Sequence, residues 1–328
     1  MACLQRTKFE DLCSEVHISI FDYLNLNEIV ESFFDLNQYF KTLLCNHHLL
    51  LHCSLINEQN YVDFLLSAIS LQQMKSLKCY DYHLIQFQDP NQFSCLHTLV
   101  VFKYATNIHE ETVIDFILAI PQLKYCQVRM SQSRGRVTLS VPDYRTNAEQ
   151  LPSSLEGLDI DSKSGLSFFY FCSHVLPRLF ALRYLKVFLS CYNGIQKTIY
   201  EKPIGKLICL SKINLKIRRG SLEHLYLLAQ CTPNLEDLQL DYSPAFGDPS
   251  YINAQNWFQL LSAWTNLKIL KIYAEAKINI DPAQSYTIEQ HFQSIPFLVE
   301  RHICPLIDLS PNARTQRKVS FAVHYPNH

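Results

Sequence analysis

The chain has 328 residues, of which 48% are hydrophobic and 18% charged, so it is long and apolar enough to bury a large core. Its net charge of −1 gives no overall attraction to nucleic acid or to an anionic membrane. The start of the chain has no apolar signal-peptide core. The most apolar stretch, residues 166–185, is interrupted by Pro177 and by the polar residues Ser173, His174, Arg178 and Arg183. We therefore expect a globular protein with no membrane span.

The first predicted unit, residues 1–55, is helical. Apolar residues recur at spacings of three and four in three sets, which predicts three short helices. The sets are Phe9, Leu12, Val16, Ile20 and Leu24; Ile29, Val30, Phe33 and Phe34; and Leu36, Tyr39, Phe40, Leu43 and Leu44. Asn25 and Asn27 lie between the first two sets, where we expect a helix break and an N-cap. So small a unit has surplus apolar surface, which predicts a docked partner.

A connecting helix is predicted over residues 56–73. Before it, Cys45, His48 and His52 are spaced i, i+3 and i+7, which on one helix face would bring together three potential zinc ligands. The paired cysteines of structural zinc sites are missing, and histidines near a helix end are more often solvated or favourable to the helix dipole. We expect no metal and no cofactor.

From residue 74 onward the chain repeats one hexamer, apolar at positions one, four and six, as in Leu235-Glu-Asp-Leu238-Gln-Leu240. The copies begin at residues 74, 96, 123, 155, 182, 210, 235 and 267, at intervals of 22 to 32 residues. Because side chains alternate along an extended strand, positions four and six of each copy face the same core. The pattern predicts eight strands.

The segments between these hexamers have apolar residues at helical spacing, for example at Val113, Phe116 and Ile117. Several of these segments end at a proline just before the next hexamer, as at Pro121, Pro233 and Pro296. Proline cannot continue a helix and favours an extended residue before it. Each repeat is therefore predicted to be one strand and one helix.

The hexamer and its period resemble the leucine-rich repeat, for which a period of roughly 20 to 29 residues is typical. This resemblance implies an α/β solenoid over residues 56–303, with a curved parallel sheet inside and helices outside. The asparagine that regular repeats have after the strand is missing, so the repeats are irregular. A doubly wound α/β domain is the alternative, but the chain has only seven glycines, none of them in a GxGxxG arrangement.

The twelve cysteines are scattered singly, without a CxxC pair. Some, such as Cys79 and Cys126, occupy strand core positions that suit a small apolar residue. We therefore expect reduced thiols and a cytoplasmic or nuclear protein.

The N-terminal unit resembles the F-box, whose pattern is a Leu-Pro-x-Glu start, an Ile-Phe-x-Tyr-Leu helix and a final helix with paired leucines. The matching residues here are Leu12 to Glu15, Ile20 to Leu24, and Leu43 with Leu44. Cys13 stands where the pattern has proline, a departure that would loosen the turn and weaken adaptor docking. Residues 7–12, 34–40 and 251–257 are similar to F-box repeat proteins of bdelloid rotifers.

An F-box followed by leucine-rich repeats is the architecture of substrate receptors in SCF-type cullin-RING ubiquitin ligases. The resemblance implies that the adaptor subunit of the ligase contacts Leu12, Ile20, Phe21, Tyr23, Leu24, Phe33, Phe34, Leu36, Phe40 and Leu44. The alternative is that these helices only cap the end of the solenoid, since solenoids need their end cores covered.

Hexamer position seven points away from the core, towards the concave face of the expected solenoid. It holds Tyr80, Phe102, Arg129, Asp161, Phe188, Lys216, Asp241 and Tyr273. Aromatic side chains mixed with both signs of charge suit a protein partner better than a phosphate or a lipid. We predict a target-binding patch here, with an ordinary solvated sheet face as the alternative.

Two stretches exceed the repeat, residues 131–150 and 242–252, and insertions of this kind often collect on a binding face. Arg129, Arg134 and Arg136 form a small basic cluster, but no interleaved aromatics extend it, so we expect no nucleic-acid binding. Residues 304–328 are predicted to be a polar tail.

Together these patterns predict a receptor that is not an enzyme. The sequence has no GxSxG, HExxH or P-loop motif and no paired acid motif. The rivals are a stand-alone repeat scaffold that binds a protein without any ligase, and an enzyme whose site is assembled across repeats. The target protein is not identified by the sequence.

Overall fold

The structure is a computed structural model that describes residues 8–46, 49–56, 69–87, 89–103, 110–130, 152–162, 165–191, 205–244, 250, 253–278, 290–291, 294, 306–308, 311–312 and 316–325. Residues 57–68 of the connecting helix predicted over 56–73, the stretch 131–150 and most of the predicted loop 242–252 lie outside this part, as do His48, Arg134, Arg136 and Pro296.

Thirteen strands of the described residues form one sheet in the order β1-β2-β3-β4-β5-β7-β8-β9-β10-β13-β11, with β6 beside β7 and β12 beside β13. The strands are β1 (Leu51–Ser54), β2 (Met74–Tyr80), β3 (Thr98–Lys103), β4 (Tyr125–Met130), β5 (Gly157–Asp161), β6 (Leu166–Ser167), β7 (Tyr184–Ser190), β8 (Lys212–Gly220), β9 (Asp237–Pro244), β10 (Ile269–Ile278), β11 (Leu306–Asp308), β12 (Pro311–Asn312) and β13 (Gln316–Tyr325). The pairs from β1 to β10 are parallel.

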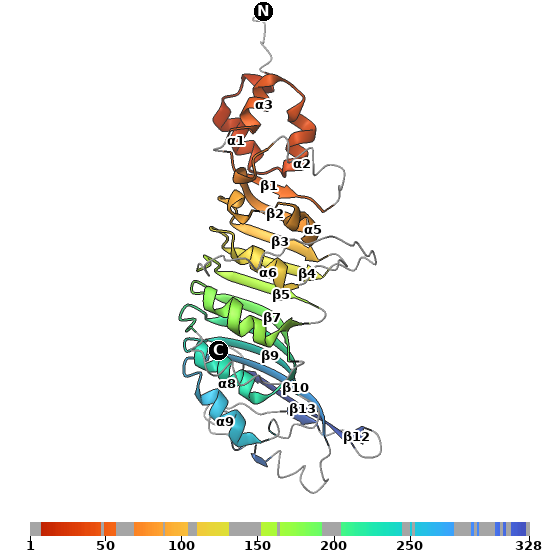
Figure 1. Cartoon of the computed structure of the whole chain (residues 1–328), viewed down its shortest axis with the longest axis vertical. Coiled ribbons are helices and arrows are strands. Elements are labelled where there is room, and N and C mark those ends of the chain that lie inside the picture. The colour runs from red at the N-terminus through yellow and green to blue at the C-terminus, as the bar shows by residue number, and fades with distance from the viewer. Residues whose placement is uncertain are drawn as a thin grey trace, which may run out of the picture.

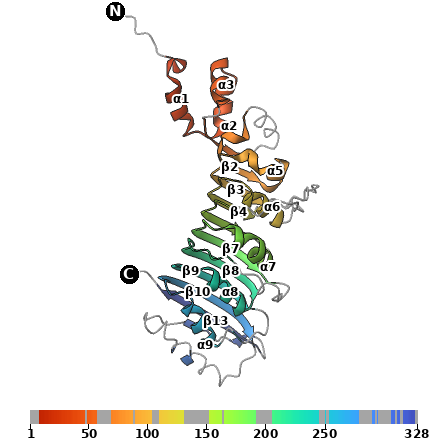
Figure 2. The same ribbon diagram turned by 60° about the vertical axis from the view of Figure 1, so that its left-hand side comes forward.

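The helical elements fall between these strands, apart from an N-terminal group. That group comprises η1 (Phe9–Asp11), α1 (Ser14–Phe21), α2 (Leu26–Ile29), η2 (Val30–Phe34) and α3 (Gln38–Leu44). The others are η3 (Leu71–Gln73), α5 (Asp81–Gln86), η4 (Pro90–Phe93), α6 (Glu110–Leu118), α7 (Phe168–Tyr170), η5 (Phe171–Val175), η6 (Leu176–Arg178), α8 (Leu222–Cys231) and α9 (Ala254–Ser262). Figures 1 and 2 show α5, α6 and α8 on one face of the sheet. The α/β class with a parallel sheet is confirmed.

All eight hexamers form strands, from position one in β2 and from position three in the other seven, and they share one register. Position four pairs from strand to strand across the sheet in the series Leu77, Leu99, Cys126, Leu158, Leu185, Ile213, Leu238 and Leu270. Every residue at positions one, four and six of the hexamers is buried. The apolar pattern therefore fixes both the pairing and the buried face of the sheet.

The turn into each strand has its own ladder of backbone hydrogen bonds. The carbonyl at hexamer position two accepts from the N–H groups at positions two and three of the next hexamer. His97 O, for example, accepts from Lys124 N at 2.9 Å and from Tyr125 N at 3.0 Å, and Glu236 O accepts from Lys268 N at 2.8 Å and Ile269 N at 2.9 Å. The turns therefore stack in the same register as the strands.

The helices pack on the face that positions four and six form. Leu225 and Leu228 of α8 lie with Ile213 and Leu238 of the sheet around one small internal cavity. The proline punctuation is confirmed where it is described, because α6 ends three residues before Pro121 and α8 two residues before Pro233. The helices therefore cover the core, and hexamer positions three, five and seven lie on the opposite, helix-free face.

The N-terminal group has the three expected helical segments, namely α1, α2 continued by η2, and α3, with the short η1 before them, and it is joined to the sheet. The side chain of Asn25 accepts from Glu28 N at 3.2 Å and so forms the predicted N-cap. Asn27 Nδ2 donates to Ser54 O of β1 at 3.2 Å, and the buried Gln73 Nε2 donates to Leu44 O at 3.0 Å. The group therefore covers the first strand of the sheet.

Strand β1 was not expected. The sequence predicts helical spacing through residues 45–52, but α3 ends at Leu44 and His52 lies in β1 with its ring beside Ser76 Oγ. Cys45 and His52 therefore do not lie on one helix face, so the arrangement that would make them joint zinc ligands is not formed. Leu50, Cys53 and Leu55 are a further copy of the hexamer pattern, and Cys53 pairs with Leu77 in the common register.

The prediction of a polar tail over residues 304–328 is wrong for its described part. Strand β13 runs antiparallel to β10, with pairs from Leu270 with Tyr325 to Ile278 with Arg317, and β11 pairs with β13 in turn. The edge that β10 would otherwise leave open is therefore paired. The hexamer pattern does not predict this strand because β13 is antiparallel and lies outside the parallel register.

Candidate protein-interaction surfaces

The helix-free face is a continuous surface of hexamer positions three, five and seven. The eight predicted target-binding residues form one row on it, since Tyr80 pairs with Phe102, Phe102 with Arg129 and Arg129 with Asp161. Ile160, which precedes Asp161, pairs with Val187, which precedes Phe188, and the row continues from Phe188 to Lys216, Asp241 and Tyr273. Arg129, Asp161, Lys216 and Tyr273 are exposed, Tyr80, Phe102 and Asp241 are half-buried, and Phe188 is buried. The fold thus brings the predicted patch together.

Some of the charged side chains on this face are paired across neighbouring strands. Lys212 Nζ lies 2.8 Å from Asp237 Oδ2, and Lys186 Nζ lies 3.2 Å from Asp159 Oδ2. Asp159 Oδ2 also accepts from Gln127 Nε2 at 2.9 Å. These pairs hold the side chains of adjacent strands in fixed positions.

Phe188 of β7 is covered by two cations from β8. Lys216 Nζ lies 5.6 Å and Arg218 Cζ 5.5 Å from the centre of its ring. Lys216 also forms an ion pair of 2.9 Å with Asp241, in which both side chains are about half exposed. Arg218 is exposed and has no acidic partner among the described residues. We call Phe188, Lys216 and Arg218 the basic patch.

The helix-free face as a whole has more basic than acidic side chains. Over strands β2 to β10, the described positions on this face comprise seven basic residues, Lys78, Arg129, Lys186, Lys212, Lys216, Arg218 and Lys271, and four acidic ones, Asp159, Asp161, Asp237 and Asp241. The face therefore has a surplus of three positive charges, although the whole chain has a net charge of −1.

The ten predicted adaptor contacts divide by exposure. Tyr23 is 90% exposed and Leu36 is 56% exposed. Leu12, Ile20, Leu24 and Phe33 are half-buried, and Phe21, Phe34, Phe40 and Leu44 are buried. The buried four form part of the core of the helical group. A partner that docks on the folded chain therefore meets the other six.

The core of the helical group is an aromatic cluster around the buried His17. Its Nδ1 lies 3.1 Å from Tyr39 Oη and its Nε2 lies 2.9 Å from Phe9 O, so the ring joins α1 to α3 and to the segment before α1. Phe9 and Phe40 pack against the ring with centroids at 4.7 and 5.2 Å. These contacts fix the short helices relative to one another.

Three exposed apolar residues of this group are missing from the predicted contacts. Phe9, Val16 and Tyr39 are 37%, 40% and 42% exposed. All three belong to the periodic sets in the sequence, so their position was available as a signal. Periodicity alone does not separate a buried position from one at the margin of the apolar stripe.

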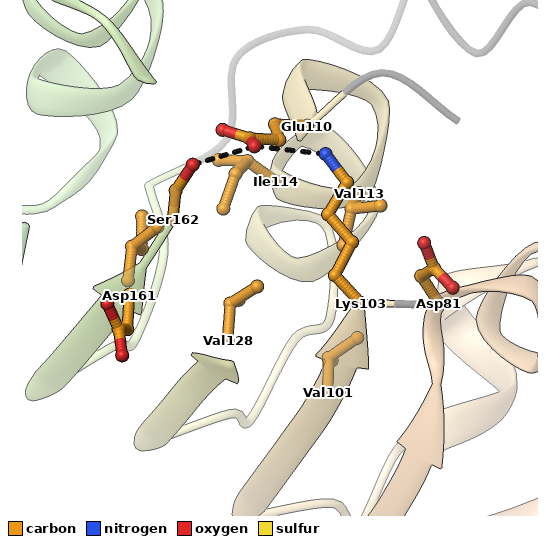
Figure 3. A pocket seen from close by; sticks show the side chains of 10 residues that line it. Asp81, Val101, Lys103, Glu110, Val113, Ile114, Val128, Asp161 and Ser162 are labelled. Carbon is orange, nitrogen blue, oxygen red and sulfur yellow. Dashed lines mark hydrogen bonds and ion pairs between the residues drawn. The ribbon is translucent and has the colours of Figure 1, made fainter. Parts of the chain in front are cut away.

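A small cavity lies where β3, β4 and β5 end beneath α6 (Figure 3). Val101, Val128 and Ile114 line its apolar part. At its rim, Glu110 Oε1 accepts from Lys103 Nζ at 3.0 Å and from Ser162 Oγ at 2.7 Å. Its volume is about 10 Å³, the lower limit for one water molecule, so it has no room for an organic ligand.

Comparison with protein-family models and with curated proteins gave no match.

Two other results concern ions and membranes. The part of the chain that the structure describes holds no group of three or more metal-ligating side chains. No helix within that part is long and apolar enough to span a membrane.

The ten described cysteines are free thiols, and burial raises the pKa of Cys79 and of Cys191, the latter to about 12. Such buried thiols are poorly reactive.

Proposed function

We propose that this chain is a non-catalytic substrate receptor of an SCF-type cullin-RING ubiquitin ligase. In this proposal the N-terminal helical group is an F-box that docks the adaptor subunit, and the sheet with its helices is an irregular leucine-rich-repeat solenoid that holds a target protein. Transfer of ubiquitin is left to the other subunits. The receptor acts by raising the effective concentration of target lysines near the conjugating enzyme.

The observation that carries this proposal is the exposure of Tyr23 and Leu36, at 90% and 56%, the two most exposed large apolar residues of the described helical group. Large apolar side chains of this kind are costly to leave in water, and aromatic ones often anchor protein interfaces. Both residues belong to the F-box resemblance. Figure 2 shows α1 and α3 beyond the β2 end of the sheet, away from α8 and α9.

A stand-alone scaffold is the second candidate. It is favoured by the hydrogen bonds that join the helical group to the sheet, from Asn27 to Ser54 and from Gln73 to Leu44. A group that covers the first strand performs the role of an end cap whether or not it also binds an adaptor. Adaptor binding therefore decides between the two candidates.

The experiment is co-elution of the full chain with the adaptor subunit on a sizing column, followed by a binding titration. Tyr23→Asp and Leu36→Asp place a charge on the proposed contact and leave the core intact. We expect at least a tenfold loss of affinity, since a central apolar anchor typically contributes about 2 kcal/mol to the free energy of binding. Phe21→Asp is unsuitable because Phe21 is only 1% exposed and the variant would unfold the group.

The matched control is Ile208→Asp, since Ile208 is 60% exposed and lies outside the helical group. It should bind the adaptor like the unmodified chain. Absence of a complex with the folded, unmodified chain would overturn the receptor proposal and leave the scaffold.

A further inference from the structure

From the basic patch and the charge surplus of the helix-free face, we infer that the target segment held there is an acidic peptide segment of a protein, rich in Asp and Glu. This inference rests on the proposed function for its setting, because it names the chemistry of the target. It is argued from β7 and β8, which are distant in sequence from the proposed adaptor contacts.

The first step is the state of Arg218. Its guanidinium lies over the buried ring of Phe188 at 5.5 Å, which orders the side chain without using its hydrogen-bond donors. No described acidic side chain pairs with it. An ordered guanidinium with free donors is suited to bind a carboxylate in a bidentate manner.

The second step concerns the neighbours of Arg218. Lys216 shares the ring of Phe188 from two residues away, and its ion pair with Asp241 is solvent-exposed. Exposed ion pairs are weak, so a carboxylate of a partner competes with Asp241 at little cost. The patch thus offers two cations to a partner.

The third step is the charge of the whole face. Three of its four acidic residues already have a basic partner, whereas Lys78, Arg129, Arg218 and Lys271 have no ion pair with a described residue. These four come from β2, β4, β8 and β10, so the surplus extends along the helix-free face. An extended acidic segment crossing the strands would meet positive charge at several points.

A nucleic acid fits the same surface less well. Asp159 and Asp161 of β5 and Asp237 and Asp241 of β9 lie among the basic residues and would repel a phosphate backbone that crosses these two strands. A peptide places its carboxylates at chosen positions, whereas a nucleic acid has a phosphate at every nucleotide. The alternating charges therefore favour the peptide.

The test is selection of a displayed library of random peptides on the purified full chain, with the selected peptides read by sequencing and then titrated. We expect Asp and Glu to be enriched over Lys and Arg, and binding to weaken as salt is raised. Arg218→Glu should lower the affinity of the chain for the selected peptides by about fivefold or more. Arg218→Gln, which keeps a long polar side chain, is the second variant if the first does not fold.

Lys206→Glu is the matched control, because Lys206 is exposed and precedes β8, whereas Arg218 lies near the end of that strand. It makes the same change of charge and should leave binding unaltered. Enrichment of neutral or basic peptides, no enrichment at all, or tighter binding of a single-stranded oligonucleotide than of any selected peptide would each overturn the inference. None of these residues belongs to the adaptor contacts, so this result is independent of the co-elution result.

Discussion

Cys13 is the residue at which the sequence departs from the F-box pattern, and its backbone is already suited to the missing proline. Its φ and ψ are −71° and 158°, and Leu12 before it is extended at −73° and 149°. Proline requires a φ near −65° and an extended predecessor. The turn into α1 is therefore formed without proline, and the looser turn and weaker adaptor docking that the sequence suggests stay predictions.

We predict that Cys13→Pro raises the free energy of unfolding by about 0.4–1 kcal/mol, because proline restricts the unfolded chain and costs no strain here. Urea unfolding followed by circular dichroism measures this difference. Cys13→Ala serves as the control, since it removes the thiol without the ring. A proline variant less stable than the alanine variant would show that the backbone at this turn differs from the one described.

The buried His83 should make the stability of the folded chain depend on pH. It is 2% exposed, its Nδ1 accepts from Tyr80 N at 3.4 Å, and its Nε2 has no partner among the described residues. Burial lowers the pKa of His83 to about 4, below its ordinary value of 6.5. Between these values the unfolded chain binds a proton that the folded chain does not, so stability falls as pH is lowered from 6.5 to 4.

The expected loss from this one group is on the order of 3 kcal/mol over that interval. Urea unfolding at pH 7 and pH 4.5 compares the unmodified chain with His83→Leu, in which this loss should be absent. The exposed His174 gives the control His174→Leu, which should keep the full pH dependence. If His83→Leu and the unmodified chain lose the same stability, the depressed pKa of His83 is refuted.

At the scale of the strand, the two faces of β9 differ sharply in what a substitution should cost. Leu238 is 1% exposed and pairs with Ile213 and Leu270, whereas its neighbour Gln239 points to the helix-free face. Leu238→Ala should cost about 2–5 kcal/mol through the cavity that it leaves. Gln239→Ala should cost under about 1 kcal/mol. Equal costs, measured by urea unfolding, would mean that the assigned faces are wrong.

The same alternation explains which elements the sequence revealed. A strand in the common register must place apolar residues at positions one, four and six, so the sequence alone predicts all eight of these strands. Strand β1 has the pattern at Leu50, Cys53 and Leu55 but begins only seven residues after the end of α3, and its apolar residues also fit helical spacing. Short apolar runs are ambiguous between helix and strand for this reason.

Strand β13 was missed for a different reason. It is antiparallel, so its register is set by β10 rather than by a repeated hexamer, and the charges of Arg317 and Lys318 favour the interpretation as a polar tail. For the candidate sites, the row from Tyr80 to Tyr273 followed directly from the hexamer. The exposure of Tyr23 and the burial of Phe21 did not, because periodicity does not report what packs against each helix.

Strand β13 also yields a prediction, since it pairs with the last parallel strand. Deleting residues 313–328 would leave the β10 edge unpaired, and open edges promote association between chains. We expect the truncated chain to aggregate at concentrations at which the full chain is monodisperse, as measured by light scattering. Deletion of residues 326–328 alone, which follow β13, is the control and should have no effect. A monodisperse truncated chain would argue against the pairing of β10 with β13.

For the whole molecule, the two candidate surfaces lie in different parts of the chain. The exposed apolar residues are in the helical group at one end of the sheet, and the basic patch is on β7 and β8, with β1 to β5 between them (Figure 1). A rigid sheet that connects two binding surfaces suits a receptor that holds a target at a set distance from a ligase. A scaffold without a ligase would need only the second surface.

The most direct test of this division is hydrogen–deuterium exchange of the full chain with and without the adaptor subunit. The receptor proposal predicts slower exchange on adaptor binding within residues 9–44, around Tyr23 and Leu36, and unchanged exchange in β7 and β8. Protection that falls on β7 and β8, or no protection anywhere, would contradict it and leave the N-terminal helices as a cap on the sheet.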